Sequence, residues 1–460
     1  MLRDDQPPPA EPGGNPAAEP AKEPATDPAT DPAALARVRR KVTVATAIGN
    51  FVEWFDSGAY AVMSATIAVL FFPQFDPAAA LLATWAIFAA GFIARPLGAL
   101  FFGHYGDRIG RNRALALSVL CMSGSTFAIG LLPGYATIGL AAPVLLLLMR
   151  TVQGFSTGGE YTGASSFIME YAPADRRARY ASAVPLTVGV AAVAGSLVGV
   201  VLTGSLSEEA LYSWGWRVPF LIAGPLGVIG LYLRSRLDDT PVFREMQRSE
   251  EVRSSPLRDA FRLSGRQILT LFGYSITNAI GYYFMSSYMI SYMSESLHFS
   301  KTEALLTSVV SMLAYSLLCP FAAMASDRFG RRPMLLTACL GFVLLTVPAF
   351  ALMGTGLAGA MLGTSVLAML VAVIGTSNVP AMVEMFPAQL RASGSAVGYT
   401  AAYVLFGGTA PFVATWLVTT SGSPVSPAYY LMGAAAVGAV VIIAAFRETK
   451  DLPLTRTTVR

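Results

Sequence analysis

A short charged loop occurs twice in this chain, and each copy stands between two long apolar runs. The first copy reads Gly-x-x-x-Asp-Arg-x-Gly-Arg from Gly103 to Arg111, and the second reads Ser-Asp-Arg-Phe-Gly-Arg-Arg over 326–332. A second motif follows each copy at nearly the same spacing, as Glu-Tyr-Ala-Pro at 170–173 and Glu-Met-Phe-Pro at 384–387. Two motifs repeated in the same order predict a chain built from two related halves.

Composition places both halves in a lipid bilayer. Of the 460 residues, 54% are hydrophobic and only 13% are charged, whereas soluble domains carry about 25% charged residues. Apolar runs of roughly 20 residues predict membrane-spanning helices. We therefore expect an all-α membrane protein of twelve transmembrane helices in two six-helix bundles, at 43–72, 81–103, 114–133, 140–171, 180–204, 215–235, 266–293, 303–325, 334–353, 357–384, 393–420 and 428–447.

Arginine clusters alternate with the predicted spans and mark one side of the membrane. The positive-inside rule then places both termini in the cytoplasm, and the expected location is a bacterial inner membrane. Because the basic residues set topology, no nucleic-acid partner is expected. The expected organisation is a Pro-rich disordered tail (1–36), an N-terminal bundle (37–235), a cytoplasmic inter-bundle segment (236–265), a C-terminal bundle (266–447) and a cytoplasmic tail (448–460).

Five ionisable residues fall inside predicted spans, all in the N-terminal half: Glu53, Asp56, Arg95, Arg150 and Glu160. Charge inside a bilayer costs free energy, so the default interpretation is functional. Glu53 and Asp56 share one helical face with Tyr60, and their mutual repulsion favours proton binding by one of them. The alternative is a structural ion pair in which Arg95 or Arg150 neutralises these acids.

Arg150 and Gln153 share a face of the 140–171 helix. An arginine stays charged in any protein, so Arg150 either offsets an acid permanently or meets an anionic group, and a carboxylate is the natural partner. The candidate substrate-binding residues are Arg95, Arg150, Gln153, Asn50, Tyr60 and Tyr282.

An aromatic stripe marks the 266–293 run. Its members recur at helical spacing and are Tyr274, Asn278, Tyr282, Met285, Tyr288 and Tyr292. Such stripes usually pack in a core, but tyrosine faces also attract a quaternary ammonium group. Both interpretations stay open at this stage.

The repeated loops have a mechanical interpretation as gates. Asp107 and Asp327 are able to cap and pair across a helix end, holding one arrangement of the helices closed. A role in topology alone explains the arginines but not the aspartates repeated with them. The candidate gating residues are Gly103, Asp107, Arg108, Gly110, Arg111, Asp327, Arg328, Gly330 and Arg331.

Enzymatic chemistry finds little support. The Gly-Phe-Ser-Thr-Gly run at 154–158 matches a nucleophile elbow, but it lies within a predicted helix, and the only later histidine is His298 in a loop. Two histidines and three scattered cysteines predict no metal cluster. We expect no catalytic residues, no metal and no cofactor.

The loop motifs resemble the signature of the major facilitator superfamily. More narrowly, the chain resembles the metabolite:proton symporter family over roughly 40–450. Three motifs carry this resemblance, namely Gly-Asn-x-x-Glu-Trp-Phe-Asp at 49–56, Arg-Pro-x-Gly-Ala at 95–99 and Arg-x-x-Gln-Gly-x-x-x-Gly-Gly-Glu at 150–160. That family includes proline/betaine transporters and permeases for α-ketoglutarate, shikimate and citrate.

The resemblance implies proton-driven uptake of a small carboxylate-bearing metabolite by alternating access. It implies cavity charges at Asp56, Arg95, Arg150 and Glu160, a gate at Asp107 and Arg108, and proton coupling through Asp56, Glu160 and Glu53. With two arginines and three acids the cavity is neutral once one acid is protonated, which favours a zwitterion such as proline or glycine betaine. A dicarboxylate or shikimate symporter, an efflux antiporter and a non-transporting sensor remain alternatives.

Overall fold

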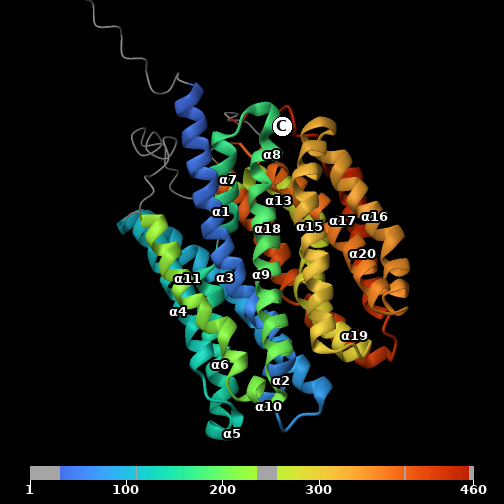
Figure 1. Ribbon diagram of the computed structural model, residues 1–460. Coiled ribbons are helices and arrows are strands. Elements are labelled where there is room, and N and C mark those ends of the chain that lie inside the picture. The colour runs from blue at the N-terminus through green and yellow to red at the C-terminus, as the bar shows by residue number, and fades with distance from the viewer. Residues whose placement is uncertain (1–31, 110, 159, 236–255, 388–389, 455–460) are drawn as a thin grey trace, which may run out of the picture.

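The computed structural model describes residues 32–454, apart from 110, 159, 236–255 and 388–389. Within this part of the chain every regular element is a helix. Figure 1 shows most of the long helices running in roughly the same direction, side by side.

The N-terminal half supplies the helices on the left and in the centre of Figure 1. Its elements are α1 (Pro32–Val62), α2 (Ser64–Phe71), α3 (Pro77–Ile109), α4 (Arg111–Leu131), α5 (Tyr135–Ile138), α6 (Ala141–Ser156), α7 (Glu160–Tyr171), η1 (Ala174–Arg176), α8 (Arg177–Ala181), α9 (Ala183–Ser205), α10 (Glu208–Ser213), η2 (Gly215–Arg217) and α11 (Val218–Ser235).

The C-terminal half supplies the yellow to red helices. Its elements are α13 (Pro256–Tyr283), the π-helical η3 (Phe284–Tyr288), α14 (Met289–Ser291), the π-helical η4 (Tyr292–Ser296), α15 (Lys301–Phe329), α16 (Arg331–Met353), α17 (Leu357–Glu384), α18 (Arg391–Ala402), the π-helical η5 (Tyr403–Gly407), α19 (Ala410–Ser421) and α20 (Ser426–Ala445).

These elements confirm the expected fold class. Eight helices in the described part of the chain are long and apolar enough to cross a membrane, and the sharply bent pair α1 and α2 makes a ninth. The apolar stretch Leu117–Leu131 of α4 and the helix α6 are shorter than these spans. Helix α13 continues directly into η3. Each of the twelve predicted runs therefore coincides with a helix or with a broken helix.

Helix contacts group the elements into two bundles. In the first, α3 packs on α6, α4 on α11 and α1 on α9; in the second, α17 packs on α15 and α16, while α20 packs on α13 and α16. The bundles meet mainly where α9 lies along α15 and where α3 contacts α19. These contacts between the halves place the candidate site, because they define the seam at the centre of the molecule.

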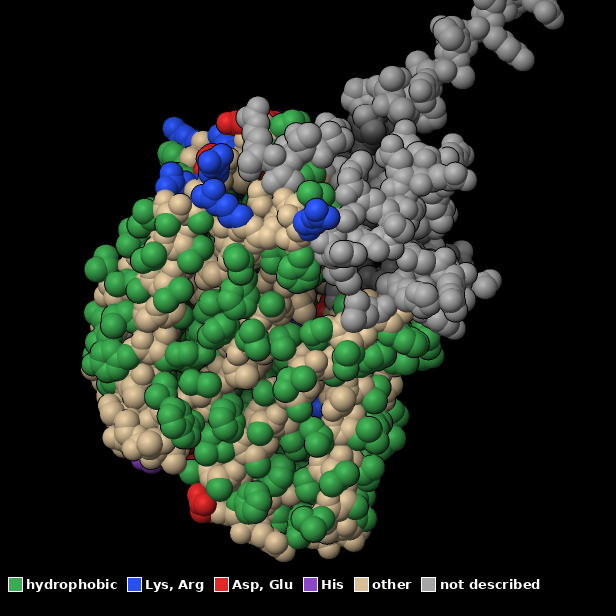
Figure 2. Space-filling model, turned by 180° about the vertical axis from the view of Figure 1, so that it is seen from behind, with side chains coloured by type: hydrophobic (Ala, Val, Ile, Leu, Met, Phe, Trp, Pro, Cys, Tyr) green, Lys and Arg blue, Asp and Glu red, His purple; other side chains and the backbone are tan. Residues whose placement is uncertain are grey.

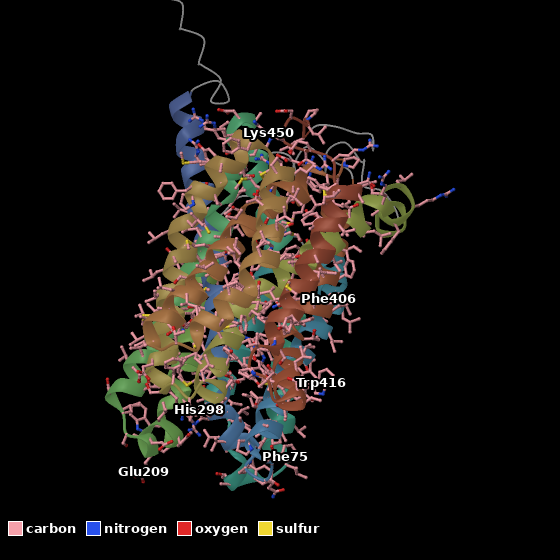
Figure 3. All side chains as sticks on the ribbon, turned by 90° about the vertical axis from the view of Figure 1, so that its right-hand side faces the viewer. Phe75, Glu209, His298, Phe406, Trp416 and Lys450 are labelled. Carbon is pink, nitrogen blue, oxygen red and sulfur yellow. The ribbon has the colours of Figure 1, made fainter. Side chains whose placement is uncertain are left out.

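The surface is divided into an apolar middle and two polar ends. Figure 2 shows hydrophobic side chains over the body of the molecule and Lys and Arg gathered at one extremity, which we call the basic end. Lys450 lies there, whereas Phe75, Glu209 and His298 lie at the opposite end (Figure 3). Exposed leucines such as Leu317 and Leu344 suit contact with lipid tails.

Three boundaries differ from the sequence-based expectation. Helix α1 already begins at Pro32, and α13 begins at Pro256 with a kink at Ser264, because proline fits the first helical turn, where its missing N–H is not needed. The last residues of the expected inter-bundle segment are therefore helical. Helix α20 ends at Ala445, and the chain after it packs against the basic end. The expected disordered tail falls mostly on 1–31, and most of the inter-bundle segment on 236–255, outside the described residues.

Glycines bring α3 and α6 into backbone contact. A Cβ atom added to Gly98 would lie 1.6 Å from the carbonyl oxygen of Phe155, and one added to Gly154 would lie 1.7 Å from that of Gly91. No side chain fits at such distances, so the Arg-Pro-x-Gly and Gln-Gly motifs form one close helix pair. This pair holds the helix that carries Arg95 against the helix that carries Arg150.

We predict that Gly98→Ala destabilises the fold. Overpacking a tight interface costs about 1–3 kcal/mol, and the cost here falls at the upper end, because the added methyl meets backbone rather than a mobile side chain. Thermal unfolding in detergent measures the effect. Gly124→Ala in α4 is the matched control, since nothing lies within 4 Å of its added Cβ. Equal melting temperatures for the two variants would contradict the prediction.

Candidate functional site

The centre of the molecule holds aromatic rings contributed by both halves. The rings of Trp54 (α1) and Tyr282 (α13) meet edge to face with centroids 5.0 Å apart. Those of Tyr161 (α7) and Tyr399 (α18) stack in parallel at 4.9 Å. All four of these side chains come from helices at the seam, so the rings separate whenever the halves do.

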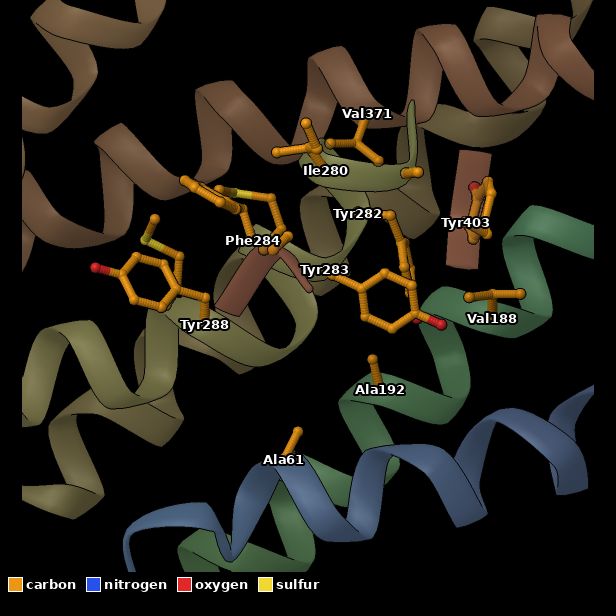
Figure 4. Close-up of a cluster of buried hydrophobic side chains, with 14 of the residues drawn as sticks. Ala61, Val188, Ala192, Ile280, Tyr282, Tyr283, Phe284, Tyr288, Val371 and Tyr403 are labelled. Carbon is orange, nitrogen blue, oxygen red and sulfur yellow. The ribbon is translucent and has the colours of Figure 1, made fainter. Parts of the chain in front are cut away.

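A π-helical turn explains why the predicted aromatic stripe divides in two. Tyr282 faces Trp54, but Tyr292, past η3, packs 5.3 Å from Phe350 inside the C-terminal bundle. A π turn contains more residues than an α turn, so it rotates the face of the helix that follows. Before this turn, Tyr282 and its neighbour Tyr283 lie close to α9, where Val188 and Ala192 are (Figure 4).

Arg150 is buried and rests on aromatic faces. Its side chain is 4% exposed, and its guanidinium carbon lies 4.4 Å from the ring centre of Tyr60 and 4.8 Å from that of Phe88. The guanidinium donates a hydrogen bond to the side-chain oxygen of Gln153. The side-chain amide of Gln153 in turn donates to the hydroxyl of Thr126 at 2.8 Å. Gln153 thus orients the guanidinium, as their shared helical face predicted.

Tyr283 brings the described charges of the site together. Its hydroxyl interacts electrostatically with Arg95, Glu53 and Arg150. Arg95 is half-buried and lies 4.0 Å above the ring of Phe92, and Glu53 is buried in α1. Sequence reasoning missed Tyr283, because it lies one residue off the helical stripe that contains Tyr282.

Two predicted substrate residues serve packing within the N-terminal half. The amide of Asn50 donates to the carbonyl of Val184 at 3.0 Å and to the hydroxyl of Thr187 at 2.8 Å, which joins α1 to α9. The hydroxyl of Tyr60 donates to the carbonyl of Thr84 at 2.8 Å, and its ring supports Arg150. Their part in substrate binding stays a prediction.

The structure does not describe the side chains of several predicted residues. Asp56 lies within α1, Glu160 at the start of α7, and the first loop motif at the junction of α3 and α4, but the placement of their side chains is not described. The roles assigned to Asp56, Glu160, Gly103, Asp107, Arg108, Gly110 and Arg111 therefore stay predictions.

The second loop motif joins the two halves at the basic end. The carboxylate of Asp327 accepts hydrogen bonds from the backbone N–H groups of Ala178 at 2.9 Å and Arg179 at 3.0 Å, at the start of α8 in the other half. Arg331, which is fully buried, donates to Asp327 at 3.0 Å and to Glu384 at 3.1 Å. Arg328 instead lies at the surface beside Phe329.

The chain after α20 completes this cluster. The carboxylate of Glu448 accepts hydrogen bonds from the backbone of Arg331 and of Arg332, which caps α16. A Cβ on Gly330 would lie 2.5 Å from that carboxylate, and its φ of +104° also favours glycine. The hydroxyl of Thr449 donates to Glu384 at 2.8 Å.

The opposite end is joined by hydroxyl groups and by one lysine. Ser64 pairs with Ser291 and Thr203 with Thr302, each at 3.1 Å, and a third hydroxyl pair, Ser196 with Ser308 at 3.1 Å, lies nearer the aromatic cluster. Lys301 donates a hydrogen bond to the hydroxyl of Tyr212 at 2.8 Å and lies 3.9 Å from the carboxylate of Glu208, both in the other half. The halves therefore touch at both ends, with the aromatic cluster enclosed between them.

Comparison with known proteins identifies the fold and the family. The family model described as "Sugar (and other) transporter" matches residues 42–257 and 243–459. The chain belongs to this family. The proline/betaine transporter of Salmonella typhimurium is 39% identical over 425 residues, covering 90% of this chain and 85% of the relative. The glycine betaine/proline/ectoine/pipecolic acid transporter of Dickeya dadantii is 38% identical, covering 90% and 84%.

A solved structure shows the same fold. The major facilitator superfamily proton:xylose symporter bound to 6-bromo-6-deoxy-D-glucose aligns with a TM-score of 0.73 at 18% identity, covering 92% of this chain and 98% of that one. The expected major facilitator fold is thereby confirmed. The protein is a multi-pass membrane transporter of a small molecule.

We predict that Asp327→Asn shifts the protein toward conformations open at the basic end. Hydrogen bonds to a charged group contribute about 1.5–3 kcal/mol, so losing the charge changes the open fraction about tenfold or more. Spin labels at Asp175→Cys and Phe329→Cys, both exposed and on opposite halves, report the separation once Cys121, Cys319 and Cys339 are replaced.

Glu448→Gln is the matched control for this prediction. Glu448 also accepts two backbone N–H bonds at a helix start, but within a single half. Its loss is expected to leave the label distance unchanged. An equal shift in both variants, or none in Asp327→Asn, would contradict a gating role for Asp327.

Proposed function

We propose that this protein is a proton-coupled symporter that imports a zwitterionic osmolyte, such as proline or glycine betaine, by alternating access. The observation that carries the proposal is the position of two guanidinium groups beside Tyr283 at the seam between the halves. Arg95 lies on the ring of Phe92 and Arg150 on that of Phe88, and both rings contact Tyr283. Glu53 is buried in α1. Guanidinium groups recognise a carboxylate, and the neighbouring rings attract an ammonium group. A small zwitterion carries both groups.

The charge balance supports a zwitterion over a dianion. Arg95 and Arg150 stay charged, while Glu53 and, by proposal, Asp56 and Glu160 bring negative charge to the same cavity. Protonation of one acid leaves the cavity neutral, so a neutral zwitterion enters without an uncompensated charge in a medium of low dielectric constant. The relatives named for proline, betaine and ectoine support this substrate class.

Proton coupling is proposed to reside in Asp56, Glu160 and Glu53. Glu53 is buried among aromatic rings, where an acid exchanges a proton in step with changes in its surroundings. We place the basic end in the cytoplasm, so that both termini are cytoplasmic, in a bacterial inner membrane. The bundles at 37–235 and 266–447 would then rock about the seam, with both Asp-Arg-x-Gly-Arg loops acting as cytoplasmic gates.

Proteoliposome uptake tests the function directly. With an imposed proton gradient, we expect accumulation of proline or glycine betaine, but not of α-ketoglutarate or shikimate. Asp56→Asn is expected to abolish accumulation while leaving substrate exchange, because a neutral amide cannot carry the proton. Asp175→Asn, at an exposed acid outside the spans, is the control. Accumulation of only a dicarboxylate, or gradient-driven uptake by Asp56→Asn, would refute the proposal.

Arg150→Lys tests the carboxylate contact. Lysine keeps the charge but loses the planar fork and the stacking on Tyr60 and Phe88. We expect the KM for proline or betaine to rise about tenfold, equivalent to about 1.4 kcal/mol of binding. Arg217→Lys is the matched control, because Arg217 also lies over a ring, that of Trp216, but donates its hydrogen bonds to Ser213 and Leu132 of its own half. An unchanged KM in Arg150→Lys would remove Arg150 from the binding site.

A further inference from the structure

A small pocket lies at the seam, beside the charges around Tyr283. Helices α1 and α9 of one half and α13 and η3 of the other half line it. Its walls include the aromatic rings of Trp54, Tyr282 and Tyr283 and the serine hydroxyl groups of Ser196, Ser286 and Ser287. None of the nine residues that line it carries a formal charge.

The three rings meet nearly at right angles. Trp54 and Tyr282 are inclined at 81° with centroids 5.0 Å apart, and Tyr282 and Tyr283 at 82° with centroids 5.3 Å apart. Mutually perpendicular rings present faces in different directions around a shared corner. The face of an aromatic ring carries partial negative charge, and tryptophan attracts cations most strongly. The corner therefore has the chemistry of a partial aromatic cage.

The serine hydroxyl groups of the pocket already bond to other serines. Ser196 shares a hydrogen bond with Ser308 at 3.1 Å, and Ser286 shares one with Ser287 at 3.4 Å. An unmethylated ammonium group needs several hydrogen-bond acceptors to replace its water. A trimethylammonium group needs none, because its surface is methyl groups that pack on rings. The pocket chemistry thus favours the methylated cation.

Tyr283 connects this corner to the guanidinium side of the site. Its ring packs 5.1 Å from Phe92, whose face carries Arg95 at 4.0 Å. On the other side, its ring lies 5.3 Å from Tyr282. Glu53, adjacent in sequence to Trp54, adds negative charge close to the Tyr283 hydroxyl. Tyr283 therefore belongs both to the corner of rings and to the charged part of the site, which suits a small molecule that carries both an ammonium group and a carboxylate.

We propose that Trp54, Tyr282 and Tyr283 form the subsite for the ammonium group of the transported zwitterion, and that this subsite selects a trimethylated ammonium over an unmethylated one. The inference rests on the proposed function, since it assumes a zwitterionic substrate. Trp54 is then the residue that sets the preference for the trimethylated group, because a tryptophan ring attracts cations more strongly than a tyrosine ring.

A methylation series tests the selectivity. Glycine, N-methylglycine, N,N-dimethylglycine and glycine betaine differ only in ammonium methylation, and each competes for binding to the full-length purified protein, measured by calorimetry. We expect affinity to increase along the series. Trp54→Leu is expected to weaken betaine binding about tenfold or more while changing glycine binding little, and Trp54→Phe to lie between the two. Trp416→Leu, at an exposed tryptophan, is the control.

An analogue with a neutral group in place of the ammonium group separates the effect of its charge from the effect of its shape. In 3,3-dimethylbutanoate a carbon atom replaces the ammonium nitrogen of glycine betaine, and the carboxylate is kept. We expect the wild type to prefer betaine to this anion, and Trp54→Leu to lose most of that preference. Equal weakening of every ligand in Trp54→Leu, or a flat methylation series in the wild type, would overturn the proposal. If Trp54→Leu does not fold, Trp54→Phe and Tyr282→Leu give the same comparison.

The two proposals fail in different ways. If betaine binds with the expected dependence on Trp54 but no proton gradient drives its uptake, the subsite stands and the symport function is wrong. If the gradient drives proline and betaine uptake, while the methylation preference is absent or independent of Trp54, the function stands and the subsite is wrong.

Discussion

The buried guanidinium of Arg331 organises the basic end of the molecule. It is fully removed from solvent, and a charge in that position persists only with paired acceptors. Asp327 and Glu384 supply them, and each acid then has a further partner. Asp327 reaches the start of α8 in the other half, and Glu384 reaches Thr449 of the chain after α20. One buried charge thus ties together the loop motif, the contact between halves and the C-terminal segment.

The fold was predictable because the sequence features that indicate it are long apolar runs and repeated motifs. Apolar runs of membrane-spanning length and two motifs repeated in order define the helices and the two halves. The position of Arg150 beside Gln153 followed from helical spacing alone. The same periodicity failed for Tyr283, which lies one residue off the stripe, and it failed for Tyr292, because the π-helical turn before it changes which residues share a face.

The cluster at the basic end was predicted only in part. The repeated aspartate indicated a gate, but its partners are backbone N–H groups of Ala178 and Arg179, which carry no sequence signature. Glu384 begins the second repeated motif, and nothing in that motif predicted that its carboxylate is buried. Its burial depends on a C-terminal segment that sequence reasoning treated as a simple tail, since nothing in a short polar stretch indicates where it docks.

The two ends of the molecule are held by different chemistry. Hydroxyl pairs and the exposed ion pair of Lys301 with Glu208 join the halves at one end, and buried carboxylates with guanidinium and backbone N–H groups join them at the other. The ion pair at the first end is already exposed in this closed arrangement, whereas opening the basic end exposes buried ionised groups to the surrounding electrolyte. Dissolved ions screen exposed charges much more than buried ones. The ionic strength of the solution therefore acts on the conformational equilibrium of this transporter mainly through the buried charges of the basic end.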